Sequence, residues 1–545
     1  MICYPLHRRL ALLLCIAGTT PVAASAQDSA QAAGTLLEPL PSNIPWGRYA
    51  RDVVRLYQLG SDLPIWLQGD RLSAPGQAAV QALLQAGEQG LDPRDYDADK
   101  LDSLARSVDR ARLDRIDCDR FDAQLTVDFI RYLDDLQFGR LHPRSLDRSR
   151  SDSGIDLPVA IRAAIDGDSI AQLVTATAPQ LAQYRNLRHL LVRYRRLAED
   201  SSLRPVSWTA PVGPIGRYQD LAILRKRLAA VGDLEPVWAG DLSAVYTSQD
   251  AKAVQRFQRR HGLPPTGVLD SLTAVEINTP FSWRARQIEL ALERLRWLPP
   301  IGRQRFLVVN VPAFQLFAFD STGGTGAPAL SMRVIVGNAL DTRTPVLFER
   351  MRYVDFRPYW SIPLSITVKE VLPLVRKDPN YLKRNHMEIV ARKGRVVDSL
   401  LTPELIDRIA AGELYLRQKP GGQNPLGLVK FVFPNAASVY LHGTPRPDLF
   451  EATRRDFSHG CIRVQDPTAL ALWVLQDQPT WNKAAITAAE QGKATVRVPL
   501  SRPMPVVVWY TTAVAAPNGE AWFYSDIYGH DRALQTALHP AQLFP

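Results

Sequence analysis

The spacing of apolar residues changes near residue 304, and this change most constrains how the chain can fold. Upstream, AAVQALLQAGEQG (78–90) and FDAQLTVDFIRYLDDLQFG (121–139) place apolar residues three and four positions apart, and each run ends in glycine. This spacing is typical of amphipathic helices. Downstream, RFLVVNVP and FQLFAFD (305–320) alternate apolar and polar residues, as strands do. The chain is therefore expected to be a multidomain α+β protein.

The part after residue 301 is predicted to be a mostly β domain over 301–500, followed by a C-terminal strand and tail (501–545) that pack on it. Further strand candidates are MRVIVG (332–337), RYVDFRPYW (352–360), VKFVFPN (429–435), VYLHG (439–443) and MPVVVWYTT (504–512). The stretch 369–418 is polar and has helical spacing, so it is predicted to be a helical insertion that caps a site.

The part before residue 301 divides at PVSWTAPVGPIG (205–216), a Pro- and Gly-rich linker. Residues 46–205 are predicted to form an all-α scaffold, in which Asp134 and Asp135 are expected on solvated faces. Residues 206–300 are predicted to hold a small three-helix unit and a connecting helix, with helix starts near Asp220 and Asp250.

The N-terminus has the features of a secretory leader. Residues 1–26 carry basic residues, the apolar run LALLLCIAG (10–18) and a terminal Ala-Ser-Ala, and residues 27–45 form a flexible lead-in. The apolar run is shorter than the ~20 residues of a membrane span, and no later stretch is long and apolar enough. We therefore expect a mature protein in the periplasm, acting as a monomer without a transmembrane span. The net charge of +10 suits an acidic polymer, while the absence of dense basic tracts interleaved with aromatic residues argues against nucleic acid.

The stretch FSHGCIRVQD (457–466) holds the most informative cysteine. The chain has four cysteines, and two lie in the leader, which leaves Cys118 and Cys461. Exported proteins usually pair their cysteines, so a Cys118–Cys461 disulfide is one interpretation. The favoured one is that Cys461 stays reduced because its chemistry requires a thiolate.

Two histidines accompany this cysteine in the sequence. An imidazole within hydrogen-bond reach can take the thiol proton and leave a nucleophilic thiolate. His442 closes a predicted strand and is the better base, because His459 lies only two residues before Cys461 and a side chain at that spacing generally points elsewhere. The same three side chains could also bind zinc, but the spacing of a zinc site is missing. Gly460 would allow backbone N–H groups to approach a reacting carbonyl.

The run HGTPRPDLFEATRRDFSHGCIR (442–463) resembles the signature of the YkuD-like L,D-transpeptidase family, a His followed at a distance by Ser/Thr-His-Gly-Cys. Matches at 344–345 (TP) and 358–363 (PYWSIP) support it. The small helical unit resembles peptidoglycan-binding domain 1, with matches at Phe257, Gln258, Gly262, Leu263, Thr266, Gly267 and Thr273. The whole layout is similar to the large YcbB-like branch of Gram-negative bacteria.

The resemblance implies a cysteine-dependent acyltransferase that makes 3→3 cross-links in peptidoglycan. Cys461 would attack a donor stem peptide and form a thioester, which a diaminopimelate amine of a second stem resolves; water would give carboxypeptidase activity instead. His442 would accept the proton. The implied supporting residues are Ser458, His459, Gly460 and Arg463 around the turn and the oxyanion hole, and Tyr359, Trp360, Tyr440 and Gly443 along the substrate cleft. No cofactor or metal is implied, cell-wall synthases are candidate partners, and carbapenems would acylate the thiolate.

Two positions depart from the pattern of this branch. Gly443 stands where Asp is common after the catalytic His, and Arg357 stands where Asn is common. If Asp orients the imidazole, its role passes to another group, such as a backbone carbonyl. Two alternatives remain: a cell-wall cysteine endopeptidase or carboxypeptidase, and a non-catalytic wall-binding protein.

Overall fold

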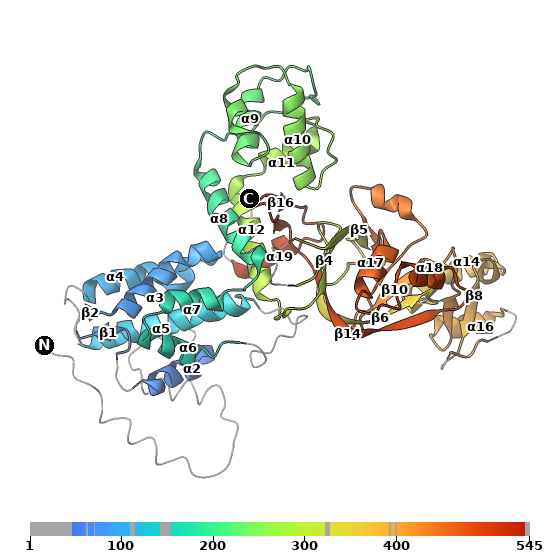
Figure 1. Cartoon of the computed structure of the whole chain (residues 1–545), viewed down its shortest axis with the longest axis horizontal. Helices are drawn as coiled ribbons and strands as arrows, with labels where there is room; N and C mark the ends of the chain where they lie inside the picture. The colour runs from blue at the N-terminus through green and yellow to red at the C-terminus, as the bar shows by residue number, and fades with distance from the viewer. Residues whose placement is uncertain are drawn as a thin grey trace, which may run out of the picture.

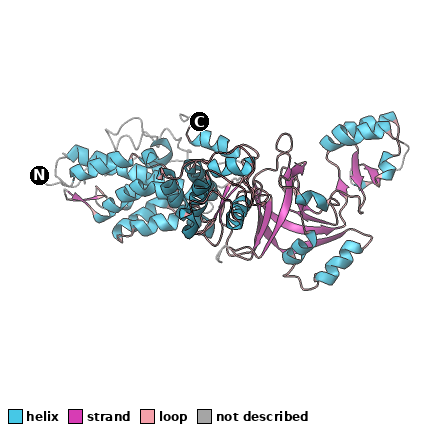
Figure 2. Ribbon diagram, turned by 90° about the horizontal axis from the view of Figure 1, so that it is seen from above, coloured by secondary structure: helices cyan, strands magenta, loops and turns pink. Residues whose placement is uncertain are grey.

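The computed structural model describes residues 46–60, 64–69, 71–108, 115–141, 154–321, 327–391, 394–397 and 401–539. The leader and lead-in expected over 1–45 lie outside the described residues. A helical part, a smaller helical domain and a mostly β domain follow one another along the chain (Figure 1), and the strands are concentrated in the last of them (Figure 2). The predicted α+β organisation is confirmed.

The first part is a helical assembly around the long helix α5 (Arg115–Phe138). Glycines end two elements as the sequence predicts: Gly90 (φ 73°) caps the 3-10 turn after α3 and Gly139 (φ 81°) follows α5. The remaining elements are α2 (Trp46–Leu59), β1 (Leu67–Gln68), β2 (Arg71–Leu72), α3 (Ala74–Leu84), η2 (Gln85–Gln89), η3 (Pro93–Tyr96), α4 (Ala98–Val108), α6 (Leu157–Asp166), α7 (Ile170–Thr177) and α8 (Ala182–Glu199).

The expectation that Asp134 and Asp135 face solvent is wrong. The two aspartates are only 3% and 5% exposed, because other scaffold elements enclose α5. Asp134 pairs with Arg48 and accepts from the Tyr49 hydroxyl at 3.1 Å. Burial, followed by the nearby charge of Asp134, raises the pKa of Asp135 to about 7. A charged position in a helical pattern therefore did not mark the solvent side.

The second part is a compact unit built from α9 (Leu221–Ala230), η5 (Pro236–Gly240), α10 (Ser248–Arg260) and α11 (Ser271–Asn278). Asp220 is the N-cap of α9, whereas Asp250 completes a capping box with Thr247 at the start of α10. The Gln258 side chain is fully buried and bonds Thr266, Gly267, Val268 and Thr273. The matched glutamine therefore holds the turn before α11 and does not face a ligand.

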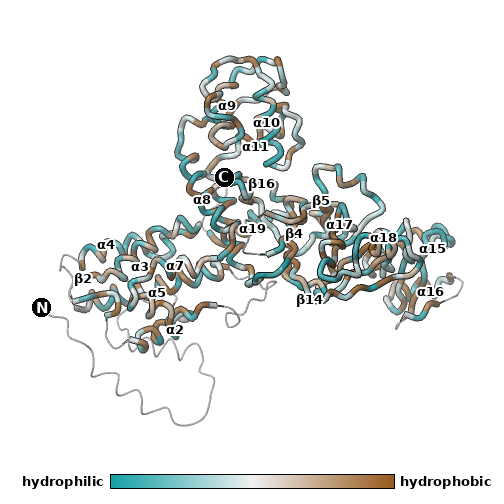
Figure 3. The backbone as a smooth tube through the Cα atoms, viewed as in Figure 1, coloured by the Kyte–Doolittle hydropathy of each residue, from teal (hydrophilic) through white to brown (hydrophobic). Residues whose placement is uncertain are grey.

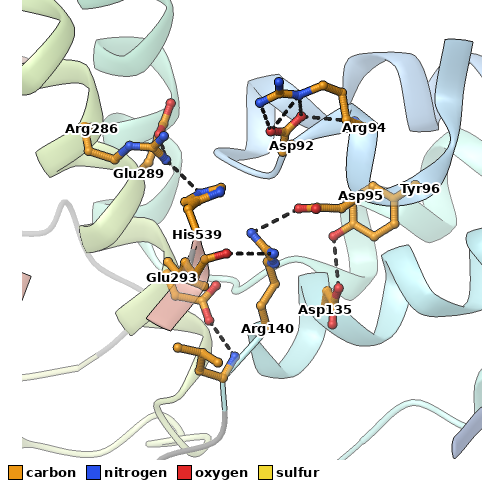
Figure 4. Close-up of polar contacts among 12 residues, drawn as sticks. Asp92, Arg94, Asp95, Tyr96, Asp135, Arg140, Arg286, Glu289, Glu293 and His539 are labelled. Atoms are coloured by element: carbon orange, nitrogen blue, oxygen red, sulfur yellow. Dashed lines mark hydrogen bonds and ion pairs between the residues drawn. The ribbon is translucent and has the colours of Figure 1, made fainter. Parts of the chain in front are cut away.

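Helix α12 (Phe281–Arg296) and the C-terminal helix α19 (His530–Leu538) join the scaffold to the β domain. Arg140, at the end of the scaffold, pairs with Asp95 at 3.0 Å and donates to the Leu538 carbonyl at 3.2 Å (Figure 4). The next residue donates its backbone N–H to Glu293 of α12 at 3.0 Å. These polar contacts lie beside a continuous apolar core that runs from the scaffold to the outer face of the β domain. The two parts are thus packed together rather than merely tethered.

Nine strands of the described residues form the main sheet of the third part, in the order β12-β5-β13-β11-β10-β6-β14-β3-β4. A further pairing of β5 with β4 closes the sheet on itself around its own apolar core. The strands are β3 (Phe306–Asn310), β4 (Gln315–Phe319), β5 (Leu330–Gly337), β6 (Leu347–Phe356), β10 (Val429–Val432), β11 (Leu441–His442), β12 (Asp456–Ser458), β13 (Ile462–Val464) and β14 (Val496–Trp509). Helices α17 (Pro467–Val474) and α18 (Lys483–Gln491) and the hairpin β15 (Ala513–Ala515) and β16 (Ala521–Phe523) complete it, with η8 (Pro447–Glu451) in a connection.

The insertion predicted over 369–418 is only partly helical. It contains a three-stranded sheet in the order β7-β9-β8, which the polar helical pattern did not reveal, and it has a core of its own. The structure begins the insertion earlier than predicted, at β7. Its elements are β7 (Trp360–Ser361), α13 (Leu364–Ile366), η6 (Thr367–Val371), α14 (Leu372–Lys377), α15 (Tyr381–Arg384), β8 (Met387–Val390), α16 (Pro403–Ala410) and β9 (Tyr415–Gln418). Because β7 pairs with β9, the insertion is anchored directly after β6.

Hydrophobic and hydrophilic residues are interspersed along all three parts (Figure 3). Across the described residues, none of the helices combines the length and the apolar character that crossing a membrane would take.

Candidate active site

Two short parallel strands bring the residues of the cysteine motif to the face that holds His442. Strand β11 pairs with β13 so that Leu441 lies opposite Ile462 and His442 opposite Arg463. The Ile462 N–H donates to the Tyr440 carbonyl at 3.0 Å and extends this register by one residue. Because side chains alternate along a strand, Tyr440 and His442 share a face with Cys461 and Arg463.

The sulfur of Cys461 lies among groups that favour its thiolate. Burial raises the pKa of the Cys461 thiol, and hydrogen bonds from Tyr440 and the positive charges of Lys430 and Arg463 oppose that rise. The Lys430 ammonium lies 3.8 Å from the centre of the Tyr440 ring. The sulfur also faces the Ser438 carbonyl at 3.9 Å. The two described cysteines are not joined: Cys118 lies in the scaffold core, so the disulfide interpretation is wrong.

His442 is buried, and its ring is held by the backbone. Its Nδ1 donates to the Gly443 carbonyl at 2.6 Å, and the ring also interacts with the Pro425 backbone carbonyl. Burial, helped by the charge of Arg463, lowers the pKa of His442 to about 3. The imidazole is therefore neutral at pH 7 and can accept a proton. The structure contains no direct hydrogen bond between the His442 ring and the Cys461 sulfur, so proton transfer takes place through a bridging water or after the two side chains approach each other.

The turn before Cys461 is fixed by hydroxyl groups. The Ser458 hydroxyl donates to the Cys461 carbonyl at 2.5 Å and accepts from the Gly460 N–H at 3.2 Å. Thr344, in the matched Thr-Pro pair, donates to the Gly460 carbonyl at 2.9 Å. Gly460 has φ 108°, a conformation that L side chains rarely adopt. Because its N–H is already bonded to Ser458, Gly460 is not poised as an oxyanion donor in this state.

His459 points away from the cysteine toward the insertion. Its Nε2 lies 2.7 Å from the Glu370 carboxylate, and both side chains are about half exposed, at 48% and 51%. Glu370 belongs to η6, so this pair links the cysteine turn directly to the insertion. Glu370 could not be predicted from the sequence, because one acidic residue in a polar stretch is usually solvated.

Arg357, Tyr359 and Trp360 lie where β6 leads into the insertion. The Tyr359 side chain is 39% exposed in the chain and lies under the Arg417 guanidinium, 4.4 Å from the ring centre. Trp360 is half-buried and interacts with the Tyr440 hydroxyl. Arg357 has φ 50°, a left-handed conformation that Asn adopts more readily than Arg.

Lys430 is the second functional candidate that the sequence did not reveal. It lies in β10 opposite His442, within a short alternating strand where a lysine normally marks the solvent side. Here it is half-buried, and burial lowers the pKa of its ammonium. In the part of the chain that is described, no three His, Cys, Asp or Glu side chains are grouped as metal ligands would be.

Three family models match successive parts of the chain. An L,D-transpeptidase catalytic domain (YkuD) matches residues 304–499, a scaffold domain matches 51–191, and a "Putative peptidoglycan binding domain" matches 217–276. A curated relative from Haemophilus influenzae, named "Putative L,D-transpeptidase", is 31% identical over 253 residues, which are 46% of this chain. The match spans about half of that relative, 49% of its length.

A crystal structure of the L,D-transpeptidase from Xylanimonas cellulosilytica (residues 123-326) also matches, at 13% identity, over 56% of this chain and 99% of that one. Its TM-score of 0.17 is too low to support a comparison of folds. The family models and the curated relative agree with the resemblance carried by the cysteine motif and by the small helical unit. Residues 304–499 are an L,D-transpeptidase catalytic domain of the YkuD type, joined in one chain to a scaffold domain and a peptidoglycan-binding domain.

Proposed function

We propose that the protein forms 3→3 cross-links in peptidoglycan, with Cys461 as the nucleophile and His442 as the proton acceptor. The observation that carries this proposal is the grouping of one partly exposed thiol with a phenol, two cations and a neutral imidazole on one face of the sheet. A nucleophilic cysteine needs such surroundings, because the thiolate and not the thiol attacks a carbonyl.

The reaction has two steps. Sulfur adds to the carbonyl between the third and fourth residues of a donor stem, the peptide C–N bond breaks, and D-Ala leaves with the proton taken from the thiol. The side-chain amine of diaminopimelate on a second stem then attacks the thioester. A new amide forms, the C–S bond breaks, and the thiol is regenerated.

The charges near Cys461 suit a stem peptide, which carries carboxylates. Arg463 is half-buried and its Nε has no hydrogen-bond partner among the described residues, so it can still pair with a carboxylate. Lys430 lies on the neighbouring strand. We place the donor's carboxylates against these two cations, between the sheet and the insertion.

Incubating the mature protein with purified disaccharide-tetrapeptide and analysing the products by mass spectrometry tests this function. A cross-linked dimer supports the transpeptidase. Tripeptide without dimer would favour a peptidase, and unchanged substrate would favour a wall-binding protein without activity. The variant Arg463→Gln is expected to raise KM, and Arg446→Gln, which changes an exposed arginine paired with Asp448, serves as its matched control.

Peptidoglycan binding by the small helical domain and export to the periplasm belong to the same proposal. One tryptophan of that domain, Trp238, is 43% exposed and could stack on sugar rings. Co-sedimentation of the Trp238→Ala variant with insoluble peptidoglycan should be reduced relative to the parent.

Sequencing the N-terminus of the protein recovered from a periplasmic fraction tests removal of residues 1–26.

A further inference from the structure

A row of polar side chains crosses the catalytic sheet and ends at the candidate active site. Arg497 of β14 lies opposite Asp355 of β6, which lies opposite Lys430 of β10. Lys430 in turn lies opposite His442 of β11, and His442 lies opposite Arg463 of β13. Residues that lie opposite each other on neighbouring strands point to the same face of a sheet. The row therefore connects two residues outside the active site, Arg497 and Asp355, with groups inside it.

The guanidinium of Arg497 occupies the whole carboxylate of Asp355. Its Nε donates to Oδ1 at 2.8 Å and its Nη2 donates to Oδ2 at 3.0 Å, so both carboxylate oxygens are bonded. The same guanidinium lies over the Tyr353 ring, 4.0 Å from the ring centre. The Asp355 side chain is only 8% exposed, whereas that of Arg497 is 59% exposed. This two-point pair fixes the direction in which the buried carboxylate points.

Lys430 does not pair with the carboxylate that its position on the sheet would offer. Long side chains directly opposite each other on antiparallel strands can reach one another. Among the described residues, however, no ion pair joins Lys430 to Asp355 or to another carboxylate. The Lys430 ammonium lies instead over the Tyr440 ring, 3.8 Å from the ring centre, and the Tyr440 hydroxyl is hydrogen-bonded to the Cys461 sulfur. Its charge is thus directed toward the nucleophile.

The charge of Lys430 favours the chemistry of two groups in the site. Burial raises the pKa of the Cys461 thiol, and the charge of Lys430 is one of the effects that oppose this rise. Burial and then the charges of Arg463 and Lys430 lower the pKa of the His442 imidazole. Both effects favour a thiolate beside a neutral base. An ion pair between Lys430 and Asp355 would offset much of this charge. The titratable and charged side chains that share the face or the turn of the thiol are Lys430, Tyr440, His442, Arg463 and His459, the last paired with Glu370.

We propose that Arg497 is a positioning residue that keeps Lys430 available to stabilise the thiolate of Cys461. It does so by binding both oxygens of Asp355. Without that guanidinium, the buried carboxylate would take the ammonium of Lys430 as its partner, because a buried carboxylate requires a counter-ion. The ammonium would then leave the Tyr440 ring, and the thiolate would lose a stabilising charge. This role rests on the proposed assignment of Cys461 as the nucleophile.

The pH profile of Cys461 alkylation by iodoacetamide, followed by peptide mapping of the full mature protein, tests this role. Lys430→Met should shift the profile upward by about one unit, because a nearby opposite charge lowers a pKa by this amount or more. Arg497→Gln should shift it upward by at least half as much. Arg502→Gln, the same change at an exposed residue of the same strand, is the matched control and should leave the profile unchanged.

A second substitution separates this role from a merely structural one. Asp355→Asn alone should not shift the profile upward, and Asp355→Asn combined with Arg497→Gln should return it to that of the parent. Removing a second partner of an ion pair restores no packing, so only the release of Lys430 accounts for such a rescue. An unshifted profile in Arg497→Gln, or a shift that Asp355→Asn does not reverse, would overturn the proposal.

Two further comparisons keep the test decisive. If the double variant does not fold, Arg497→Gln is introduced together with Lys430→Met, where it should cause no further shift. Additive shifts of the two substitutions would overturn the proposal. Alkylation uses no stem peptide, so a protein that shows the expected shifts but makes no cross-linked dimer would overturn the proposed function and leave this role of Arg497 standing.

Discussion

The imidazole Nδ1 of His442 donates to the carbonyl oxygen of Gly443 at 2.6 Å. This bond orients the ring through the backbone of residue 443. The resemblance to the YcbB-like branch leads one to expect an aspartate at that residue, directly after the histidine. A carbonyl can only accept a hydrogen bond, so Nδ1 carries a proton in this contact. The departure at residue 443 is therefore compatible with a competent base.

Displacing this carbonyl should reduce the activity. Gly427 has φ 64°, and a Cβ added there would lie 2.6 Å from the Thr444 nitrogen and 2.8 Å from the Gly443 carbonyl carbon. The Gly427→Ala variant should lose roughly 10- to 100-fold in turnover, because small displacements of catalytic groups have effects of this size. Gly421→Ala, with no atom within 4 Å of the added Cβ, is the matched control. Equal turnover of the two variants would contradict the assigned role of the Gly443 carbonyl.

The hydroxyl of Tyr440 should control the acidity of Cys461. Its hydrogen bond lowers the thiol pKa, so Tyr440→Phe should shift the pH profile of Cys461 alkylation by iodoacetamide upward, by about one unit. Peptide mapping separates Cys461 from the buried Cys118. Tyr415→Phe, at a residue that is 44% exposed, provides the control. An unchanged alkylation profile in Tyr440→Phe would show that the phenol does not act on the sulfur.

The contact between His459 and Glu370 should restrain the insertion more than it stabilises the fold. Both side chains are half exposed, and exposed ion pairs contribute only about 0–1 kcal/mol. Glu370→Ala should therefore leave the melting temperature nearly unchanged while increasing amide hydrogen exchange over residues 364–377. Glu413→Ala removes an exposed pair with Arg408 inside the insertion and should not affect that stretch. Equal exchange in both variants would argue against this role for the pair.

Much of the catalytic domain could be predicted from the sequence because its signals are local. The alternating strands near 305–320 and the Ser-His-Gly-Cys turn depend on neighbouring residues, and both are found in the structure. Which side chains surround Cys461 is decided instead by which strands pair in the sheet. Lys430 becomes its neighbour only because β10 lies next to β11, and no spacing in the sequence reveals that order.

Asp134 and Asp135, which were predicted to be exposed but are buried, illustrate the same limit of prediction from sequence. In α5 the apolar spacing predicts a helix correctly, but it does not show that other helices enclose it. Asp135 can be buried because Tyr96 donates to it at 3.1 Å (Figure 4). The strands of the insertion were missed for a related reason: β8 and β9 are short, half polar, and defined by their pairing.

The buried Asp135 should make the scaffold less stable at alkaline pH. Its folded pKa of about 7 exceeds the ordinary value of 3.8, so its stabilising contribution is present at low pH and is lost as the pH rises through 7. Asp135→Asn removes that ionisation and should melt a few degrees higher than the parent at pH 8, with a smaller difference at pH 5. Asp407→Asn, at an exposed position in α16, should show no such dependence. A constant difference between pH 5 and pH 8 would show that Asp135 does not titrate in this range.

The acyl-enzyme offers the most direct test of the proposed chemistry. The protein is incubated with disaccharide-tetrapeptide, quenched in acid, digested and mapped by mass spectrometry, alongside Cys461→Ala and His442→Ala. We predict a disaccharide-tripeptide adduct on the peptide that contains Cys461, far less of it in His442→Ala, and neither adduct nor cross-linked dimer in Cys461→Ala. Dimer formation by Cys461→Ala, or an adduct on any other residue of the parent, would contradict the assignment of Cys461 as the nucleophile.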